Sequence, residues 1–176
     1  VLTDLLYFTN QLGNLRIVKD DEGNEINPDQ NIFTIQELSH KKGYQVYFSA
    51  ADSLHLFGQP VQANDPISLD AGWHLISYLP EIELDIDVAL GSIQNNILLV
   101  KQGNGNVYCP GYNIDEIGTM AAGNGYWVYL SDAATLTYPT AGQAASNSPA
   151  TAPEPTYFSC TPRTGGNCTI ILPKSI

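Results

Sequence analysis

The sequence predicts an α+β, β-dominated protein with two tandem, related small lobes, short helices, a C-terminal linker and a strand-forming tail. Three observations predict it: an internal repeat, alternation of apolar and polar residues in short segments, and frequent Gly, Asn and Pro between those segments. Because 43% of the 176 residues are hydrophobic and 14% are charged, we expect packed cores rather than a disordered chain.

The repeat appears when the chain is shifted over itself by 82 positions, which places residues 15–58 on residues 97–140 without a gap. Fifteen of the 44 aligned positions are identical, and we interpret the two segments as an internal duplication of one scaffold. The shared residues are mostly turn formers and apolar residues, which are what a backbone needs in order to fold. They include the pairs Gly23/Gly105, Tyr44/Tyr126 and Tyr47/Tyr129.

Each copy is expected to hold the same elements in the same order. Gly23 and Gly105 lie in hairpin turns, because Gly and the neighbouring Asn tolerate the positive φ of a tight turn. The alternating segments around Tyr44, Tyr47, Tyr126 and Tyr129 are typical of strands whose aromatic rings pack in a core. Strands are expected at 15–19, 44–48 and 54–57, with counterparts at 97–101, 126–130 and 136–138, and short amphipathic helices at 2–12 and 87–94.

Residues 66–80 form an additional segment in front of the second copy. They are typical of two strands around a Gly turn, with Trp73 as a core anchor. The first copy has no counterpart of this segment, because the sequence begins too late. We therefore expect the first lobe to lack its opening strands, and a strand from a neighbouring chain is one source that could supply them.

The predicted organisation has four parts. The first lobe covers residues 1–60 and the second, complete lobe covers residues 61–139. Residues 140–155 are rich in Ala, Ser, Thr and Pro and read as an extended linker. Residues 156–176 hold two strand-like runs and are too short to fold by themselves. This tail must pack on the main body, pair with another chain or begin a further domain.

Cysteines and modification patterns give the candidate covalent sites. Cys160 and Cys168 flank a turn-rich stretch, and a disulfide between them would close a hairpin. Cys109 is left over and is expected to be a buried, inert thiol. Ser53 and Asn167 lie in short patterns that resemble glycosylation acceptors, although such patterns are frequent by chance.

Composition and motifs argue against several function classes. The net charge is −11 and the seven basic residues are scattered, so no basic stripe for nucleic acid exists, and no apolar run is long enough to insert into a membrane. No catalytic, metal-ligating or cofactor-binding motif is present, and His40, His55 and His74 are far apart. The carboxylates at residues 20–25 could bind calcium weakly, but a solvated turn explains them better. We expect no enzyme activity, cofactor or resident metal.

Several stretches resemble a repeated module of large bacterial surface proteins exported by the type IX secretion system. Residues 67–80 resemble its opening, usually Gly-Trp-Asn-Leu-Ile, with His74 in place of the usual Asn. Residues 125–129 and 135–139 fit its continuation, and residues 164–173 resemble a companion segment that usually reads Thr-Gly-Asn-Asn. The resemblance implies secretion, a surface-associated or filamentous parent protein and no catalytic activity.

The predicted function is therefore that of a non-enzymatic, extracellular or cell-surface structural or adhesive module. Its expected partners are further copies of itself, through strand exchange, or neighbouring domains of the same large protein. The alternative is a carbohydrate-binding accessory module of a secreted protein, because some of the ten Tyr and two Trp could stack on sugar rings.

Overall fold

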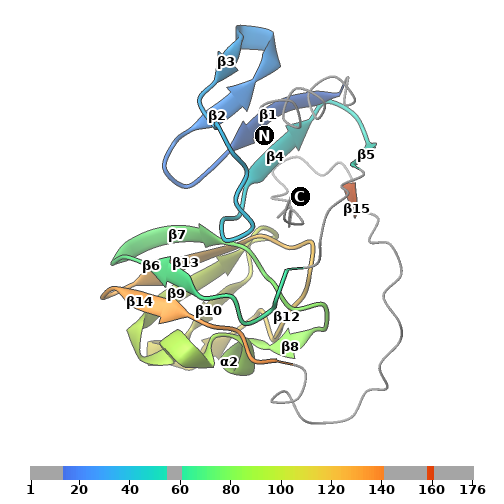
Figure 1. Cartoon of the computed structure of the whole chain (residues 1–176). Coiled ribbons are helices and arrows are strands. Elements are labelled where there is room, and N and C mark those ends of the chain that lie inside the picture. Colours follow the sequence, from blue (N-terminus) through green and yellow to red (C-terminus); the bar gives the residue numbers. More distant parts are fainter. Residues whose placement is uncertain (1–13, 55–60, 141–157, 161–176) are drawn as a thin grey trace.

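The computed structural model describes residues 14–54, 61–140 and 158–160. In these ranges the chain forms two lobes, an N-terminal lobe around a four-stranded sheet and a second lobe around a five-stranded sheet (Figure 1). Strands dominate the described elements and the helices among them are short, which confirms the predicted α+β, β-dominated fold class.

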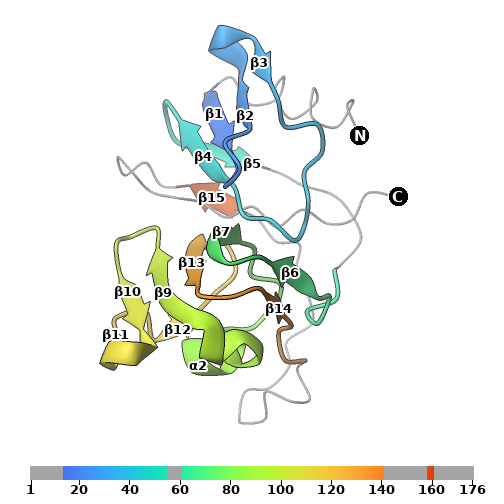
Figure 2. The same ribbon diagram turned by 90° about the vertical axis from the view of Figure 1, so that its left-hand side faces the viewer.

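The first lobe has the strand order β3-β2-β1-β4, with all neighbours antiparallel. A short 3-10 helix, η1, joins β2 to β3, and a further strand, β5, pairs with the C-terminal strand β15 of the same chain. Figure 2 shows β15 beside β5 at the side of the first lobe. The elements are β1 (Leu15–Lys19), β2 (Glu25–Asn27), η1 (Pro28–Gln30), β3 (Ile32–Phe33), β4 (Gln45–Phe48), β5 (Asp52–Leu54) and β15 (Phe158–Cys160).

The second lobe has the order β11-β10-β9-β13-β7, and two small ribbons, β14 with β6 and β12 with β8, accompany this sheet. Its helical part, α2 followed by η2, precedes β9 in the chain. The strands are β6 (Ile67–Leu69), β7 (Gly72–Ile76), β8 (Leu84–Asp85), β9 (Ile97–Gln102), β10 (Val107–Cys109), β11 (Ile114–Asp115), β12 (Thr119–Met120), β13 (Tyr126–Leu130) and β14 (Ala134–Leu136). The helices are α2 (Ile86–Ala89), η2 (Gly91–Asn96) and η3 (Pro110–Tyr112).

The two sheets repeat each other at the offset of 82 residues. Strands β1 to β3 and η1 correspond to β9 to β11 and η3, and β4 and β5 correspond to β13 and β14. Gly23 and Gly105 have φ angles of 86° and 101° in the equivalent turns, as their position in the sequence predicts. The Tyr44 hydroxyl accepts a hydrogen bond from the backbone N–H of Ser39, and Tyr126 does the same for Ala121. An internal duplication would produce this agreement between the two lobes. That the lobes arose by duplication is our interpretation.

The helices η1 and η3 show how a short sequence pattern fixes local structure. Each begins with a proline, Pro28 or Pro110, whose constrained φ suits the first position of a helix. Each ends at an asparagine in the left-handed region, Asn31 with φ of 55° and Asn113 with φ of 56°. The same Pro-x-x-Asn spacing therefore produces the same turn in both lobes.

The two cores differ in size. The described core of the first lobe consists of Leu15, Val18, Ile26, Ile35, Tyr44 and Val46. The core of the second lobe contains apolar residues at the equivalent positions and, in addition, apolar residues of β6, β7, α2 and η2. Tyr138 is fully buried there and donates a hydrogen bond of 2.8 Å to the carbonyl oxygen of Ser77, and burial raises the pKa of Tyr138. The opening strands thus contribute a substantial part of the second core.

Some sequence predictions are corrected by the structure. Tyr44 and Tyr126 are buried as expected, but Tyr47, Tyr129 and Trp73 are 57%, 36% and 45% exposed and are not core residues. The physical reason is the period of a strand: Tyr44 and Val46 point inward, so Tyr47 points to the opposite face of the sheet. Trp73 lies opposite Tyr129 on that outer face of the second sheet.

Other boundaries also differ from expectation. The helix expected at 87–94 is a single α-turn, α2, followed by the 3-10 helix η2. The strands expected at 54–57 and 136–138 are β5 and β14, each of which begins two residues earlier. The helix expected at 2–12 lies outside the described residues, as do residues 141–155 of the expected linker.

Asn31 and Asn113 give a matched test of the repeated turn. Asn31→Ala and Asn113→Ala should each lower the free energy of unfolding by about 1 kcal/mol, because alanine resists the left-handed conformation more than asparagine does. Asn31→Gly and Asn113→Gly should be neutral or slightly stabilising. Urea denaturation of the four variants checks this, and equal stability of the Ala and Gly variants would contradict it.

Candidate functional site

The junction between the two lobes holds a concentration of polar contacts between segments far apart in the sequence. Its backbone component is an antiparallel bridge between Lys42 and Ile76, next to a hydrogen bond of 2.8 Å from the N–H of Gly43 to the carbonyl oxygen of Leu75. A Cβ atom on Gly43 would lie 2.8 Å from Leu75 Cγ and 2.9 Å from the Ile76 carbonyl oxygen. Glycine is therefore required where the first lobe meets β7.

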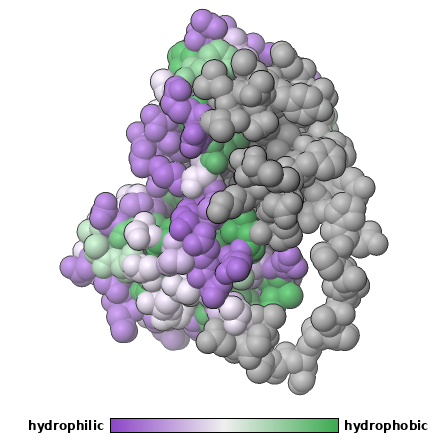
Figure 3. All heavy atoms as spheres, in the orientation of Figure 1, coloured by the Kyte–Doolittle hydropathy of each residue, from purple (hydrophilic) through white to green (hydrophobic). Residues whose placement is uncertain are grey.

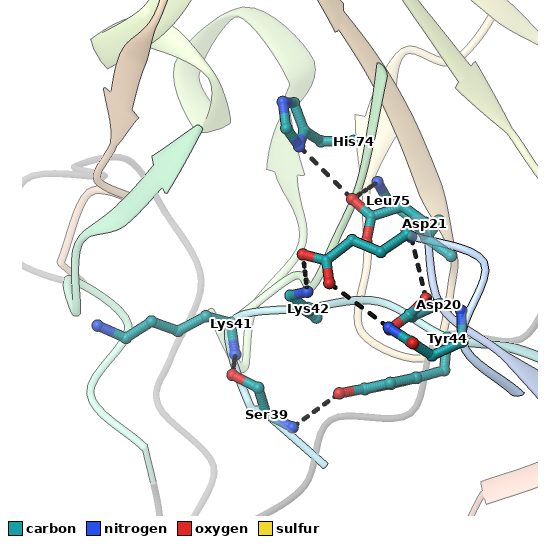
Figure 4. A network of polar contacts seen from close by, with 10 residues as sticks. Asp20, Asp21, Ser39, Lys41, Lys42, Tyr44, His74 and Leu75 are labelled. Carbon is teal, nitrogen blue, oxygen red and sulfur yellow. Dashed lines mark hydrogen bonds and ion pairs between the residues drawn. The ribbon is translucent and has the colours of Figure 1, made fainter. Parts of the chain in front are cut away.

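Asp21 is the main polar side chain of this junction (Figure 4). It extends from the turn after β1, its side chain is 9% exposed, and its Oδ2 accepts a hydrogen bond of 3.2 Å from the N–H of Leu75. His74 Nδ1 lies 3.5 Å from the same oxygen. A carboxylate that loses its water in this way is stabilised by N–H donors and by neighbouring cations. Asp21 thus couples the hairpin turn of the first lobe to β7 of the second.

Lys42 places a positive charge close to this carboxylate. Its Nζ donates to Glu22 Oε1, and the two side chains form an ion pair. Burial by itself would lower the pKa of Lys42, but the hydrogen bond to Glu22 and the charges of Asp21, Glu22 and Asp20 outweigh it and raise the pKa. Lys42 therefore stays charged and compensates the acidic turn.

A second group of contacts ties the first lobe to the segment that leads into β6. His40 Nε2 lies 2.7 Å from Asp65 Oδ2, and Lys41 Nζ lies 3.1 Å from Asp65 Oδ1 and 2.9 Å from the carbonyl oxygen of Pro66. The hydrogen bonds from His40 and Lys41 hold the pKa of Asp65 below its usual range. The Ser77 hydroxyl donates to the His40 carbonyl oxygen at 2.6 Å. The segment 39–44 of the first lobe therefore contacts the second lobe in two places, at β7 and at residues 65–66.

The acidic turn at residues 20–25, considered above as a weak calcium site, is occupied by contacts within the protein. Asp20 Oδ1 accepts hydrogen bonds from the N–H groups of Glu22 and Asn24, which is the pattern of a side chain that shapes its own turn. Asp21 contacts β7 of the second lobe, and Glu22 is paired with Lys42 within the first lobe. In the described part of the chain no three His, Cys, Asp or Glu side chains are grouped so that they could hold a metal ion.

A separate polar cluster joins the exposed Asp87 to the half-buried Gln94 and the buried Tyr108 in the second lobe. The Tyr108 hydroxyl donates to Asp87 Oδ1, and Gln94 Nε2 donates to the Tyr108 oxygen at 2.6 Å. Burial and the hydrogen bond to Asp87 raise the pKa of Tyr108 to about 12. These contacts fasten the helical part of the lobe to β10, and we assign them a structural role.

Three aromatic side chains, Trp73, Trp127 and Tyr129, form an aromatic face on β7 and β13. The rings of Trp73 and Tyr129 are stacked with centroids 4.9 Å apart and an interplanar angle of 26°. Trp127 meets Trp73 edge-on at 6.4 Å. Figure 3 shows hydrophilic residues over much of the visible surface and apolar residues in small patches. Sequence reasoning missed this face because it placed Trp73 and Tyr129 in the core.

The remaining sequence candidates are placed as follows. Cys109 is half-buried rather than fully buried, and its thiol donates to the Leu98 carbonyl oxygen at 3.2 Å. Ser53 lies in β5 and Cys160 in β15, while Cys168 and Asn167 lie outside the described residues together with the proposed disulfide. His40 and His74 have different partners in the junction, and His55 is outside the described residues.

No family model, curated protein or solved structure matches the chain. Within the described ranges no helix is long and apolar enough to cross a membrane. The junction and the aromatic face are therefore the observations from which a function can be argued.

Gly43 gives the direct test of the junction. Gly43→Ala should destabilise the chain by about 1–3 kcal/mol, because the added methyl group overlaps Leu75 and the Ile76 carbonyl oxygen. It should also raise the radius of gyration measured by small-angle X-ray scattering, because the lobes are pushed apart.

Gly111→Ala is the matched control, since a Cβ at Gly111 has no atom within 4 Å. It should leave both stability and radius of gyration nearly unchanged. If Gly43→Ala had the same stability and radius of gyration as Gly111→Ala, this would contradict the close contact between Gly43 and β7.

Proposed function

We propose that the chain is a non-enzymatic, extracellular structural or adhesive module, part of a bacterial surface protein or filament. The observation that carries the proposal is the junction, in which the polar side chains bind one lobe to the other. Asp21, His40 and Lys41 of the first lobe each have a partner in the second lobe, Leu75 for Asp21 and Asp65 for the other two. A junction held by such contacts suits a protein that keeps repeated modules in a fixed orientation or transmits mechanical force between them.

The positions shared by the two lobes support the same proposal. Gly23 and Gly105 form turns and Tyr44 and Tyr126 lie in the cores, whereas the shared pair Tyr47/Tyr129 is exposed. The printed hydrogen bonds and ion pairs of Asp21, Asp65 and Tyr108 join segments that are far apart in the chain, which is a structural role. The resemblance to modules of type IX-secreted surface proteins agrees with this function and with an extracellular location.

Chain-to-chain strand exchange is the proposed mode of self-association. Strand β15 follows the expected linker and pairs with β5, a short strand at the side of the first lobe. A terminal strand on a linker can leave its own lobe and pair with the same strand of a neighbour, because the backbone hydrogen bonds are identical in both arrangements.

The test is assembly of the purified full chain. Electron microscopy and light scattering should show oligomers or filaments that increase with protein concentration. Ser159→Pro should reduce assembly at least about tenfold, because proline in β15 removes a backbone donor from the strand. Ser146→Pro, a matched change in the expected linker, should leave assembly intact. A chain that stays monomeric at all concentrations and adheres to no cell or matrix surface would contradict the proposal.

The second candidate function is carbohydrate binding, and the aromatic face favours it. Trp73 and Tyr129 are 45% and 36% exposed although their rings are large and apolar. Aromatic rings held in this way present flat faces against which the apolar side of a sugar ring can pack.

The aromatic face can be tested with a glycan array followed by calorimetry. If a glycan binds, Trp73→Ala and Tyr129→Ala should each weaken it about tenfold, which corresponds to the loss of one aromatic contact of on the order of 1.4 kcal/mol. Tyr112→Ala is the control, because Tyr112 is 81% exposed and lies outside the aromatic face. Absence of binding by the unchanged chain, or equal loss with Tyr112→Ala, would exclude this function.

A further inference from the structure

Two members of the aromatic face, Tyr129 and Trp73, belong to a row of apolar side chains that crosses the second sheet. Tyr129 lies directly opposite Trp73 on one side and opposite Leu99 on the other. The register of β9 with β10 continues to place Cys109 opposite Leu99, and Cys109 pairs with Ile114 of β11. Each of the five strands therefore contributes one residue to this row, which is about 19 Å long because neighbouring strands lie about 4.8 Å apart.

This first row lies on the outer face of the sheet and is exposed although its members are apolar. Trp73, Ile114 and Tyr129 are 45%, 41% and 36% exposed, while Leu99 and Cys109 are half-buried. Single exposed apolar residues are common in proteins, but a contiguous series of them marks a surface that contacts a partner.

A second row on the same face connects this surface to the junction between the lobes. Lys101 lies opposite Val107 on one side and opposite Trp127 on the other, and Trp127 lies opposite Leu75. Leu75 is 2% exposed, and its Cγ would lie 2.8 Å from a Cβ atom on Gly43 of the first lobe. The outer face is therefore continuous with an interface that the protein already forms.

The first lobe shows that the scaffold does not require an apolar outer face. Glu25 and Gln45 stand at the positions where the second lobe has Val107 and Trp127. Both copies nevertheless form the corresponding strands, β2 and β4 in one lobe and β10 and β13 in the other. The apolar residues of the second face are thus not explained by folding, and we attribute them to a contact outside the lobe.

Charge and composition favour a second copy of this chain as the partner. The net charge of −11 makes two copies repel each other in most orientations. Neither row contains an acidic residue, and Lys101 is their single charged member, so two copies can approach here without placing carboxylates against each other. Aromatic and aliphatic residues with few charges are also the composition of the centre of a protein interface.

We infer that the outer face of the second sheet packs against the same face of a second copy, with the two sheets stacked and related by a twofold axis. The two rows cover roughly 300–400 Å² per copy, about half of the area that a partner buries in a standard interface. The dimer is therefore weak and depends on concentration. It uses a surface other than β5 and β15, so it stands whether or not strands are exchanged, and it excludes a glycan from the same face.

Tryptophan fluorescence tests the inference without any substitution, because Trp73 and Trp127 are the two tryptophans of the chain and both lie on this face. Analytical ultracentrifugation should show a doubling of mass as the protein concentration rises. Acrylamide quenching of the tryptophans should fall at least about twofold over the same range, as the second copy covers the rings. Ser159→Pro, which removes strand exchange, should show the same doubling and the same protection.

Tyr129→Ser and Tyr47→Ser are matched variants, since the two tyrosines are equivalent in the two lobes and are 36% and 57% exposed. Tyr129→Ser should weaken the dimer at least about tenfold, because a twofold contact contains this ring once from each copy. Tyr47→Ser should change the dissociation constant less than about twofold, because Tyr47 lies on the first lobe.

Four results would overturn the inference. They are a chain that stays monomeric, a dimer that leaves quenching unchanged, equal effects of the two tyrosine variants, and protection of the tryptophans by an added glycan but not by concentration. The last result would assign the face to a sugar. Assembly that depends on Ser159 is measured separately, so strand exchange and this dimer can fail independently.

Discussion

The close approach of Gly43 to β7 is the constraint on which the arrangement of the two lobes depends. Since a side chain at this position would overlap Leu75, the backbones meet directly and share an antiparallel bridge. The polar contacts follow from that proximity, because Asp21 can reach the N–H of Leu75 only where the chains are this close. Each of these interactions is modest by itself, but together they fix one orientation of two small sheets.

The two copies differ where one of them faces the other. The turn of the second lobe has Gly103 where the first has Asp21, and its N–H donates within its own lobe to the Gly125 carbonyl oxygen at 3.3 Å. The equivalent of Gly125 is Gly43, which contacts the second lobe instead. The difference between Asp21 and Gly103 therefore reflects their surroundings, because only Asp21 lies at the contact surface between the two copies.

The turns and the inward-facing positions could be predicted from sequence, because Gly23, Asn31 and Tyr44 act through local backbone geometry and strand period. The outward position of Trp73 could not be predicted in this way, because a large apolar residue type does not by itself say on which face of a strand the side chain lies. The junction was missed for a similar reason: Asp21 looks like any acid in a solvated turn until Leu75, 54 residues later, is placed beside it. The sequence signal for the junction is that Asp21 has an uncharged residue, Gly103, at the equivalent position of the second copy.

The pairing of β5 with β15 also determines the order in which the protein can fold. Asp52 and Cys160 are neighbours across this ladder although 107 residues separate them in the chain. Contacts between such distant residues form slowly, because a large loop must close first. The second lobe contains its own opening strands and can fold before β15 is synthesised, whereas β5 of the first lobe must wait for β15. During synthesis the edge of β5 is accordingly unpaired, and another protein or a neighbouring nascent chain can bind it in that interval.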